Sequence, residues 1–328
     1  MLEIRDQGLY CPAGGFYIDP VAPVERAVLT HAHGDHARTG SAHYLTANSG
    51  FNLVRTRLGD DASIQTLQYG ETLRLGDVDV SLHPSGHILG SAQVRMERNG
   101  EVWVAAGDYK RAPDPTCPPL EPLRCHTFVT ESTFALPIFR WQQPGETLCA
   151  IDDWWRDNQA SGKASMLFVY AIGKAQRVLA GIDASIGPII CHGAVERINA
   201  IYRAQGIPLP ESADLKEHRR ALVLAPPSAM GSPWLRRFTP MSTAMASGWM
   251  RIRGTRRRRA LDRGFVLSDH ADWPALHEAI AATGAETVWV THGYIGPLVR
   301  WLTEQGKQAI PVELALPEGE AADEEVAQ

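Results

Sequence analysis

Residues 30–37 read THAHGDHA and directly follow a short apolar run. If that run is a strand, His31 and His33 lie two residues apart at its end, so both side chains point to the same side. Asp35 and His36 begin the next turn and face a second point nearby. Imidazole and carboxylate ligands without thiolate are typical of Zn, Mn or Fe sites. The segment therefore predicts a site for two divalent metal ions, with Zn favoured and Mn as the second candidate.

Three further residues occupy the ends of other expected strands. His87 stands in HPSGHILGSA just after one strand, Asp108 stands in AAGDYK just after the next, and His292 ends the strand TVWVTH. A lone histidine at such a place is usually a core or surface residue. Together with residues 30–37, these three side chains supply the additional ligands that two metal ions require, and we interpret them as a metal-binding set.

The composition is that of a globular protein. A length of 328 residues suggests about two domains, and 44% hydrophobic with 21% charged residues is ordinary. The five cysteines are scattered without C-x-x-C spacing, which argues against a disulfide framework and a cysteine zinc site. The N-terminus lacks the features of a signal peptide, and no run approaches the roughly 18 apolar residues of a membrane span. We therefore expect a cytoplasmic protein without membrane contact.

The hydrophobic pattern divides the chain into parts. The first part is rich in strands, and Asn99-Gly100 between two alternating segments indicates a tight hairpin. From about residue 143, short apolar runs alternate with helical stretches, which is typical of βαβ units. After residue 260 the pattern predicts a helix from Trp273 to Thr283, ended by Gly284. The sequence thus favours an α/β fold, followed by an acidic tail that we expect to be disordered.

The ligand order H-x-H-x-D-H, His, Asp, His resembles that of the metallo-β-lactamase superfamily. The resemblance covers residues 1 to about 140 and 260 to 315. It implies an αββα sandwich in which the ligands arrive from strand ends. Asp19 in FYIDP matches the first motif of the superfamily, a carboxylate that supports the metal ligands from behind. Because the superfamily has many functions, this fold alone does not determine the reaction.

The long interval between Asp108 and His292 indicates which family within this superfamily the chain resembles. It holds well over a hundred residues of βαβ pattern and resembles the Rossmann-like β-CASP domain that nucleases carry as an insertion. The motifs TEST, SDHAD and THGY match those of the β-CASP family and supply Glu131, His270 and His292, and VYAIGKAQRVL resembles the start of the inserted domain. The resemblance implies a metallo-β-lactamase domain at 1–142 and 263–316, a β-CASP domain at 143–262 and an acidic tail at 317–328.

The same resemblance implies a role for each site residue. Asp108 would bridge the two ions and take part in catalysis. His270 would be the general acid that protonates the leaving 3′ oxygen, and Glu131 would hold its imidazole protonated and aimed. The metal ligands implied are His31, His33 and His87 on one ion and Asp35, His36 and His292 on the other.

Contacts with nucleic acid are expected at two places. The segment RIRGTRRRRALDR holds seven arginines, and a local basic patch suits phosphate binding in a chain whose net charge is −5. The candidates are Arg256, Arg257, Arg258 and Arg259; the alternative is a solvated loop. Lys174, at an expected helix start after Gly173, could also hold a phosphate, since helix N-termini favour anions. A plain surface lysine is the alternative there.

Three functions are consistent with the family resemblance. The compact length is most similar to that of bacterial DNA exonucleases that act in DNA repair with an ATP-dependent DNA ligase and a helicase, and it predicts single-stranded DNA as the substrate. His292, together with the TEST form of the motif that carries Glu131, instead favours an RNA-processing nuclease, as in the mRNA 3′-end endonuclease and RNase J. A catalytically inactive scaffold is the third alternative, and the intact ligand set argues against it.

Overall fold

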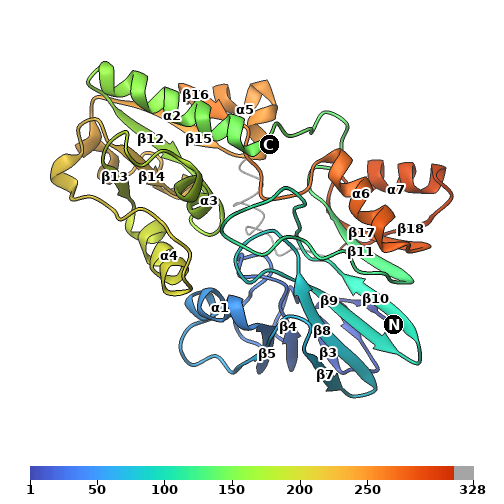
Figure 1. Ribbon diagram of the computed structural model, residues 1–328. Coiled ribbons are helices and arrows are strands. Elements are labelled where there is room, and N and C mark those ends of the chain that lie inside the picture. Colours follow the sequence, from blue (N-terminus) through green and yellow to red (C-terminus); the bar gives the residue numbers. More distant parts are fainter. Residues whose placement is uncertain (314–328) are drawn as a thin grey trace. The chain divides into compact units, whose positions relative to one another are not determined.

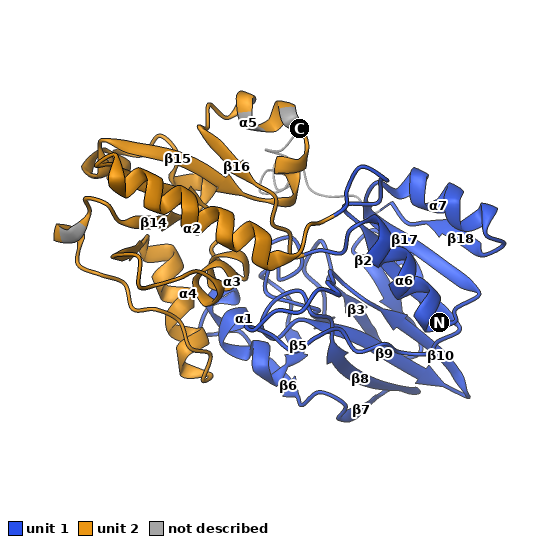
Figure 2. Ribbon diagram, turned by 45° about the horizontal axis from the view of Figure 1, so that its top comes forward, with its two compact units in different colours: residues 1–140, 270–326 blue, residues 141–269, 327–328 orange. Residues whose placement is uncertain are grey.

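The computed structural model describes residues 1–313, apart from the side chains of Glu217, Arg253, Arg256 and Arg258. The chain forms two compact units, coloured separately in Figure 2. Of the described residues, unit 1 contains Met1–Arg140 and 270–313, and unit 2 contains Trp141–Asp269. The predicted acidic tail at 317–328 lies outside the described residues.

The first sheet of unit 1 has six strands in the order β1-β2-β3-β4-β5-β6. Strands β1 to β3 are antiparallel neighbours, whereas β3 to β6 run parallel. The parallel part matters for the site, because the carboxyl ends of β4 and β5 then lie at the same edge. The strands are β1 (Glu3–Arg5), β2 (Gly8–Cys11), β3 (Phe16–Ile18), β4 (Arg26–Val28), β5 (His43–Ala47) and β6 (Ile64–Leu67).

The second sheet of unit 1 has seven strands in the order β18-β17-β11-β10-β9-β8-β7. Strands β7 to β10 form an antiparallel meander, and Asn99 and Gly100, with φ of 52° and 82°, make its predicted hairpin turn. Strands β10, β11, β17 and β18 are parallel. The strands are β7 (Thr72–Leu75), β8 (Val78–Pro84), β9 (Ala92–Arg98), β10 (Glu101–Ala105), β11 (Thr127–Ser132), β17 (Thr287–Gly293) and β18 (Gln308–Pro311).

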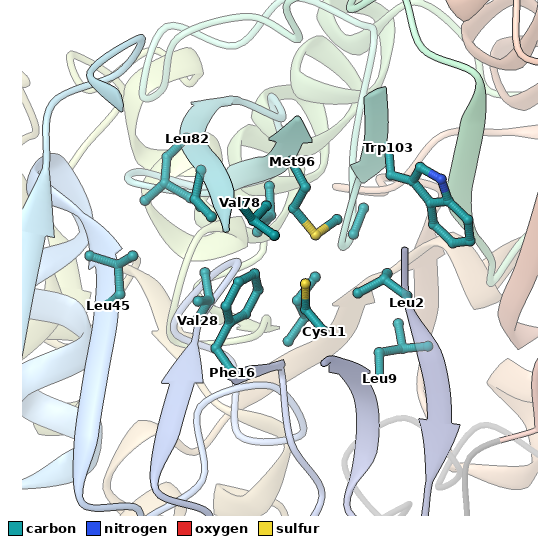
Figure 3. Packing of buried hydrophobic residues seen from close by; sticks show 14 of the residues in the cluster. Leu2, Leu9, Cys11, Phe16, Val28, Leu45, Val78, Leu82, Met96 and Trp103 are labelled. Carbon is teal, nitrogen blue, oxygen red and sulfur yellow. The ribbon is translucent and has the colours of Figure 1, made fainter. Parts of the chain in front are cut away.

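The two sheets of unit 1 pack face to face. Alternating side chains such as Phe16 and Val28 from the first sheet meet Val78 and Met96 from the second in one buried cluster, shown in Figure 3. Helices α6 (Trp273–Thr283) and α7 (Ile295–Glu304) bury Leu276, Ile280, Leu298 and Leu302 against the second sheet (Figure 1). Helix α1 (Phe51–Leu58) lies against β5 and β6. The predicted α/β class is therefore confirmed.

Unit 2 is built on a parallel five-stranded sheet in the order β13-β14-β12-β15-β16. Its strands are β12 (Ala164–Phe168), β13 (Ile189–Cys191), β14 (Leu222–Ala225), β15 (Met241–Ala246) and β16 (Arg263–Phe265), and its helices are α2 (Pro144–Ala160), α3 (Lys174–Gly181), α4 (Gly193–Ala204) and α5 (Arg253–Arg258). The short 3₁₀ turns of the chain are η1 (Asn48–Gly50), η2 (Leu215–Glu217), η3 (Pro227–Ala229), η4 (Pro233–Phe238) and η5 (Gly248–Arg251).

The bounds of unit 2 are close to those of the predicted β-CASP domain but not identical, and the domain bounds stay a prediction. The first lies at 140/141 instead of 142/143, and the second at 269/270 instead of 262/263. The second difference has a structural cause, because residues 263–265 form β16 and pair with β15 in the sheet of unit 2. A strand of three residues leaves too weak a pattern to be recognised from sequence. Among the described residues, none of the helices has the length and apolarity that a membrane crossing requires.

A close approach of two backbone segments holds the loop that carries His87. The hydroxyl of Ser91 accepts hydrogen bonds from the N–H groups of His87 and Ile88, both at 3.2 Å. Gly90, which directly precedes Ser91, lies against Gly50, so that a Cβ on Gly90 would overlap the backbone of Gly50. With a φ of +76°, Gly90 also has a conformation that other residues rarely adopt. This contact fixes the loop on the start of α1.

Gly90→Ala should therefore lower the free energy of unfolding by more than about 2 kcal/mol, since backbone strain and steric overlap add. Gly100→Ala is the matched control, because Gly100 also has a positive φ of +82° but an added Cβ there would meet nothing within 4 Å. We expect a loss of only about 1 kcal/mol for the control. Urea unfolding followed by circular dichroism measures both, and equal losses would contradict the steric argument.

Candidate metal centre

Four side chains of unit 1 converge on one point. They are His31, His33, His87 and Asp108, which offer ligand atoms that all lie within 4.8 Å of one another. The Nδ1 atom of His33 lies 3.1 Å from Nε2 of His31 and 3.0 Å from Nε2 of His87. An Asp108 carboxylate oxygen lies 3.4 Å from Nε2 of His31 and 3.7 Å from Nε2 of His87. Buried imidazole and carboxylate groups in this arrangement can bind a divalent metal ion.

His36 and Asp35 lie on the other side of Asp108. Nε2 of His36 lies 3.4 Å from a carboxylate oxygen of each aspartate. This nitrogen is buried and has no hydrogen-bond partner among the described residues. A buried polar atom without a partner is costly, and a cation held between His36 and the two carboxylates would satisfy it. The residues present therefore fit a second metal ion.

Asp19 fixes the orientation of His36 from behind. One carboxylate oxygen of Asp19 lies 2.7 Å from Nδ1 of His36 and accepts a hydrogen bond from the Thr30 hydroxyl at 2.6 Å. The other accepts from the backbone N–H of Thr30 at 2.8 Å. Because Asp19 occupies Nδ1, Nε2 of His36 is left to face the metal site. Sequence reasoning missed Thr30, whose only signal was its place directly before His31.

His292 lies beside this cluster without joining the group of four. Its ring stacks on that of His36 at a centroid distance of 5.3 Å. Its Nδ1 is 2.9 Å from the hydroxyl of Thr291, and its φ of 52° is unusual for a residue other than glycine. Strained backbone of this kind is often found at functional sites. The structure brings His292 to the predicted place, and its role as a ligand stays a prediction.

The electrostatics of the cluster suit cation binding. Burial lowers the pKa of His31 well below 6.5, so its imidazole is neutral, as a metal ligand requires. Burial also acts to lower the pKa of His36, but the carboxylates of Asp35, Asp108 and Asp19 outweigh it and raise that pKa well above 6.5. The carboxylates thus stabilise positive charge at His36, whether a proton or a metal ion supplies it.

A second group connects Asp108 to the residues of the β-CASP motifs. It consists of Asp108, Glu131 and His270, all buried. Nδ1 of His270 lies 2.8 Å from one carboxylate oxygen of Glu131 and 4.0 Å from Asp108. The other oxygen of Glu131 accepts a hydrogen bond from the backbone N–H of Tyr109 at 2.8 Å. Glu131 is therefore held at both oxygens, and it orients the His270 ring. Sequence reasoning did not predict the role of Tyr109.

The predicted nucleic-acid contacts lie in unit 2. Lys174 is only 4% exposed, and its ammonium group is 3.4 Å from the carboxylate of Asp269. Of the arginine run, Arg257 is exposed, and Arg259 contacts Met245 Sδ at 3.5 Å. The side chains of Arg256 and Arg258 lie outside the described residues. Phosphate binding by the run stays a prediction, as does that by Lys174, whose charge is already paired.

Comparison with known proteins shows that the chain is similar to a probable DNA ligase and to several ribonucleases. It is 31% identical over 307 residues to a probable DNA ligase of Opitutus terrae. This match covers 92% of this chain but only 30% of the ligase. It is 27% identical over 195 residues to ribonuclease TTHA0252 of Thermus thermophilus, covering 50% of this chain and 44% of the ribonuclease. An endoribonuclease YSH1 of Yarrowia lipolytica is 28% identical over 131 residues, a match that covers 37% of this chain and 14% of the endoribonuclease. The chain thus spans less than half the length of each of these relatives.

The fold has a counterpart among solved structures. A protein of unknown function from Enterococcus faecalis superposes with a TM-score of 0.59 over 89% of this chain and 80% of its own, at 12% identity, and so shares the fold alone. No family model matches the chain. The nuclease relatives nevertheless agree with the assembled imidazole and carboxylate cluster and with the three motifs around Glu131, His270 and His292. These relatives fit the metallo-β-lactamase/β-CASP nuclease family that the motifs of the chain resemble.

Proposed function

We propose that the protein is a metal-dependent nuclease that hydrolyses phosphodiester bonds, with single-stranded DNA as its substrate and DNA repair as its role. In this proposal, unit 1 is the αββα metallo-β-lactamase domain and Trp141–Asp269 is the inserted β-CASP domain. The observation that carries the proposal is the placement of the Glu131–His270 pair. Nδ1 of His270 lies 2.8 Å from Glu131 and 4.0 Å from the same Asp108 that contacts His31 and His36. A proton donor thus lies beside the metal-binding groups.

The proposed ligands divide between two ions around Asp108. His31, His33 and His87 would hold one ion, and Asp35, His36 and His292 would hold the other. Burial alone would raise the pKa of Asp108, but the imidazoles of His36 and His270 lower it well below 3.8, so Asp108 is an anion. Divalent ions bound there would supply a hydroxide nucleophile at neutral pH and stabilise the oxygens of an in-line displacement at phosphorus.

His270 supplies the proton that the leaving 3′ oxygen requires. Because its Nδ1 is hydrogen-bonded to Glu131, Nε2 is the nitrogen that can deliver a proton to the substrate. Glu131 is 1% exposed, and its hydrogen bond to Nδ1 holds the His270 ring in one orientation. Proton transfer by a positioned side chain usually contributes about 10²–10⁴ in rate.

Two observations bear on the choice between DNA and RNA. The match to the probable DNA ligase extends over 92% of this chain, much more than the match to the Thermus ribonuclease, and it favours DNA as the substrate. A role in DNA repair, with a DNA ligase and a helicase as partners, is part of the proposal. The names of the ribonucleases, together with His292 and the TEST motif, favour RNA processing of the mRNA 3′-end or RNase J type as the second candidate. None of the five cysteines, all within the described residues, forms a disulfide, in keeping with the proposed cytoplasmic location.

Asp108→Ala should lose both bound metal and nuclease activity, because Asp108 contacts both sides of the cluster. Elemental analysis of the purified protein is expected to find up to two ions per wild-type chain and a clear deficit in the variant. His83→Ala is the control, since His83 pairs with Glu121 at 3.1 Å outside the cluster. If Asp108→Ala kept full metal content and activity, the metal site would have to be assigned elsewhere.

His270→Ala should fold, keep its metal and bind substrate, but its turnover on nucleic acid should fall by about 10²–10⁴. A nitrophenyl phosphodiester should recover much of the loss, because its leaving group departs without a proton. Glu131→Gln should show a smaller version of the same pattern. Loss of metal, or equal losses on the two substrates, would exclude the general-acid role.

Digestion of one sequence as end-labelled single-stranded DNA and as RNA tests the substrate. We expect kcat/KM for the DNA strand to exceed that for the RNA strand at least about tenfold, a difference of about 1.4 kcal/mol in transition-state binding. Asp108→Ala, assayed in parallel, shows whether each activity belongs to this site. A preference for RNA would establish the second candidate in place of the first.

A further inference from the structure

Three charged side chains form a buried cluster in unit 2 that the proposed chemistry does not use. Lys174, Arg177 and Asp269 are 4%, 3% and 3% exposed. The carboxylate of Asp269 lies 3.4 Å from Nζ of Lys174 and 3.1 Å from Nη1 of Arg177. Removing three charges from water is expensive, and such clusters contribute little net stability. Their presence therefore calls for a role other than stabilising the fold.

The cluster holds the polypeptide immediately before His270. Besides contacting the Asp269 side chain, Nη1 of Arg177 donates a hydrogen bond to the backbone carbonyl of Ser268 at 2.5 Å. Two consecutive residues, one through its backbone and one through its side chain, are thus bound to helix α3. His270 follows directly and is the first residue of the second segment of unit 1.

The start of α3 is itself braced, so it can act as a rigid anchor. Gln176 is fully buried, and its carbonyl oxygen accepts a hydrogen bond from the backbone N–H of Gly173 at 2.8 Å. Its amide nitrogen donates to the carbonyl of Ala171 at 3.0 Å and to Asn199 on α4 at 2.8 Å. Satisfied buried networks of this kind restrict local motion. The helix turn that carries Lys174 and Arg177 therefore has little freedom to shift.

A second anchor lies on the other side of His270. The backbone N–H of Ala271 donates a hydrogen bond to the carbonyl of Tyr109 at 2.7 Å. The N–H of the same Tyr109 donates to the Glu131 carboxylate that orients the His270 ring. His270 is thus the single residue between a segment fixed on α3 and a segment fixed beside Glu131.

We infer that Lys174, Arg177 and Asp269 are positioning residues that set the backbone of the general acid His270. This inference rests on the proposed function. A misplacement of about 1 Å at a reacting group can cost about 10²-fold in rate. Releasing Ser268 and Asp269 from α3 lets the backbone of His270 move, so its ring meets Glu131 and the leaving oxygen less often. The cluster thus makes the position of the acid depend on the integrity of unit 2.

The test is Arg177→Ala in the full chain, assayed on single-stranded nucleic acid and on a nitrophenyl phosphodiester. We expect turnover on nucleic acid to fall by about 10²-fold, with a much smaller loss on the activated substrate and unchanged metal content. The double variant Arg177→Ala, His270→Ala should be no slower than His270→Ala alone, because a residue that acts through His270 has nothing left to position.

Two milder variants guard against a folding defect. Asp269→Asn keeps the shape of the side chain and removes its charge, and Arg177→Lys keeps the charge and shortens the reach to Ser268. Both should show the same dependence on the leaving group in weaker form. If all three single variants lost activity equally on both substrates, or if Arg177→Ala slowed the His270→Ala background further, the positioning role would be refuted.

Arg203→Ala is the matched control. Arg203 in α4 binds a carboxylate and a carbonyl in the same way, with Nη1 2.6 Å from Glu196 and Nη2 2.5 Å from the carbonyl of Pro210, but it contacts neither Ser268 nor Asp269. Arg203→Ala should lower the melting temperature. Any loss of activity should be equal on nucleic acid and on the nitrophenyl phosphodiester. Failure of the proposed function can be distinguished from failure of the positioning role. In the first case the wild-type protein has no nuclease activity, or His270→Ala loses activity equally on both substrates.

Discussion

The close approach of imidazole nitrogens around Asp108 is the constraint on which the rest of unit 1 depends. Nitrogens of His31 and His87 lie within 3.1 Å of His33, and a buried nitrogen of His36 has no hydrogen-bond partner among the described residues. A cation among these groups would satisfy the unpartnered His36 nitrogen and could bind the nearby imidazole nitrogens as well. The surrounding protein must therefore hold them rigidly, and the contacts behind the ligands do so.

The strand ends of the sandwich provide that rigidity. His31 follows β4 and Asp108 follows β10, while Glu131 and His292 are the penultimate residues of β11 and β17. Because strands β10, β11 and β17 are parallel neighbours, their carboxyl ends lie at one edge of the second sheet. The buried cluster between the two sheets keeps these edges in place, so apolar packing far from the site determines the ligand geometry.

His270 differs from the metal ligands in the way it is supported. It follows no strand of unit 1, and it lies at the junction where the chain leaves unit 2. Its ring is oriented by Glu131, and its backbone is fixed through neighbours that bond to α3 on one side and to Tyr109 on the other. The proposed metal ligands and the proposed proton donor thus depend on different parts of the chain, so substitutions can disturb them separately.

Sequence alone determined those features that arise from local interactions. The alternation around Asn99-Gly100 predicted a hairpin, the helix over Trp273–Thr283 ended at Gly284 as expected, and the spacing of residues 30–37 predicted that His31 and His33 lie together. These predictions succeed because each depends on neighbours within a few residues, where periodicity and turn chemistry are reliable. The order of the later ligands came from a family resemblance.

Only the tertiary structure decided the features that depend on distant partners. The assignment of Arg263–Phe265 to the sheet of unit 2 required its pairing with β15. The burial of Lys174 required Asp269, some ninety-five residues away in the chain, and the role of Thr30 required Asp19 on the far side of a turn. A charged or hydroxyl side chain has the same local pattern whether it is exposed or paired, because the energy that selects between them comes from the partner.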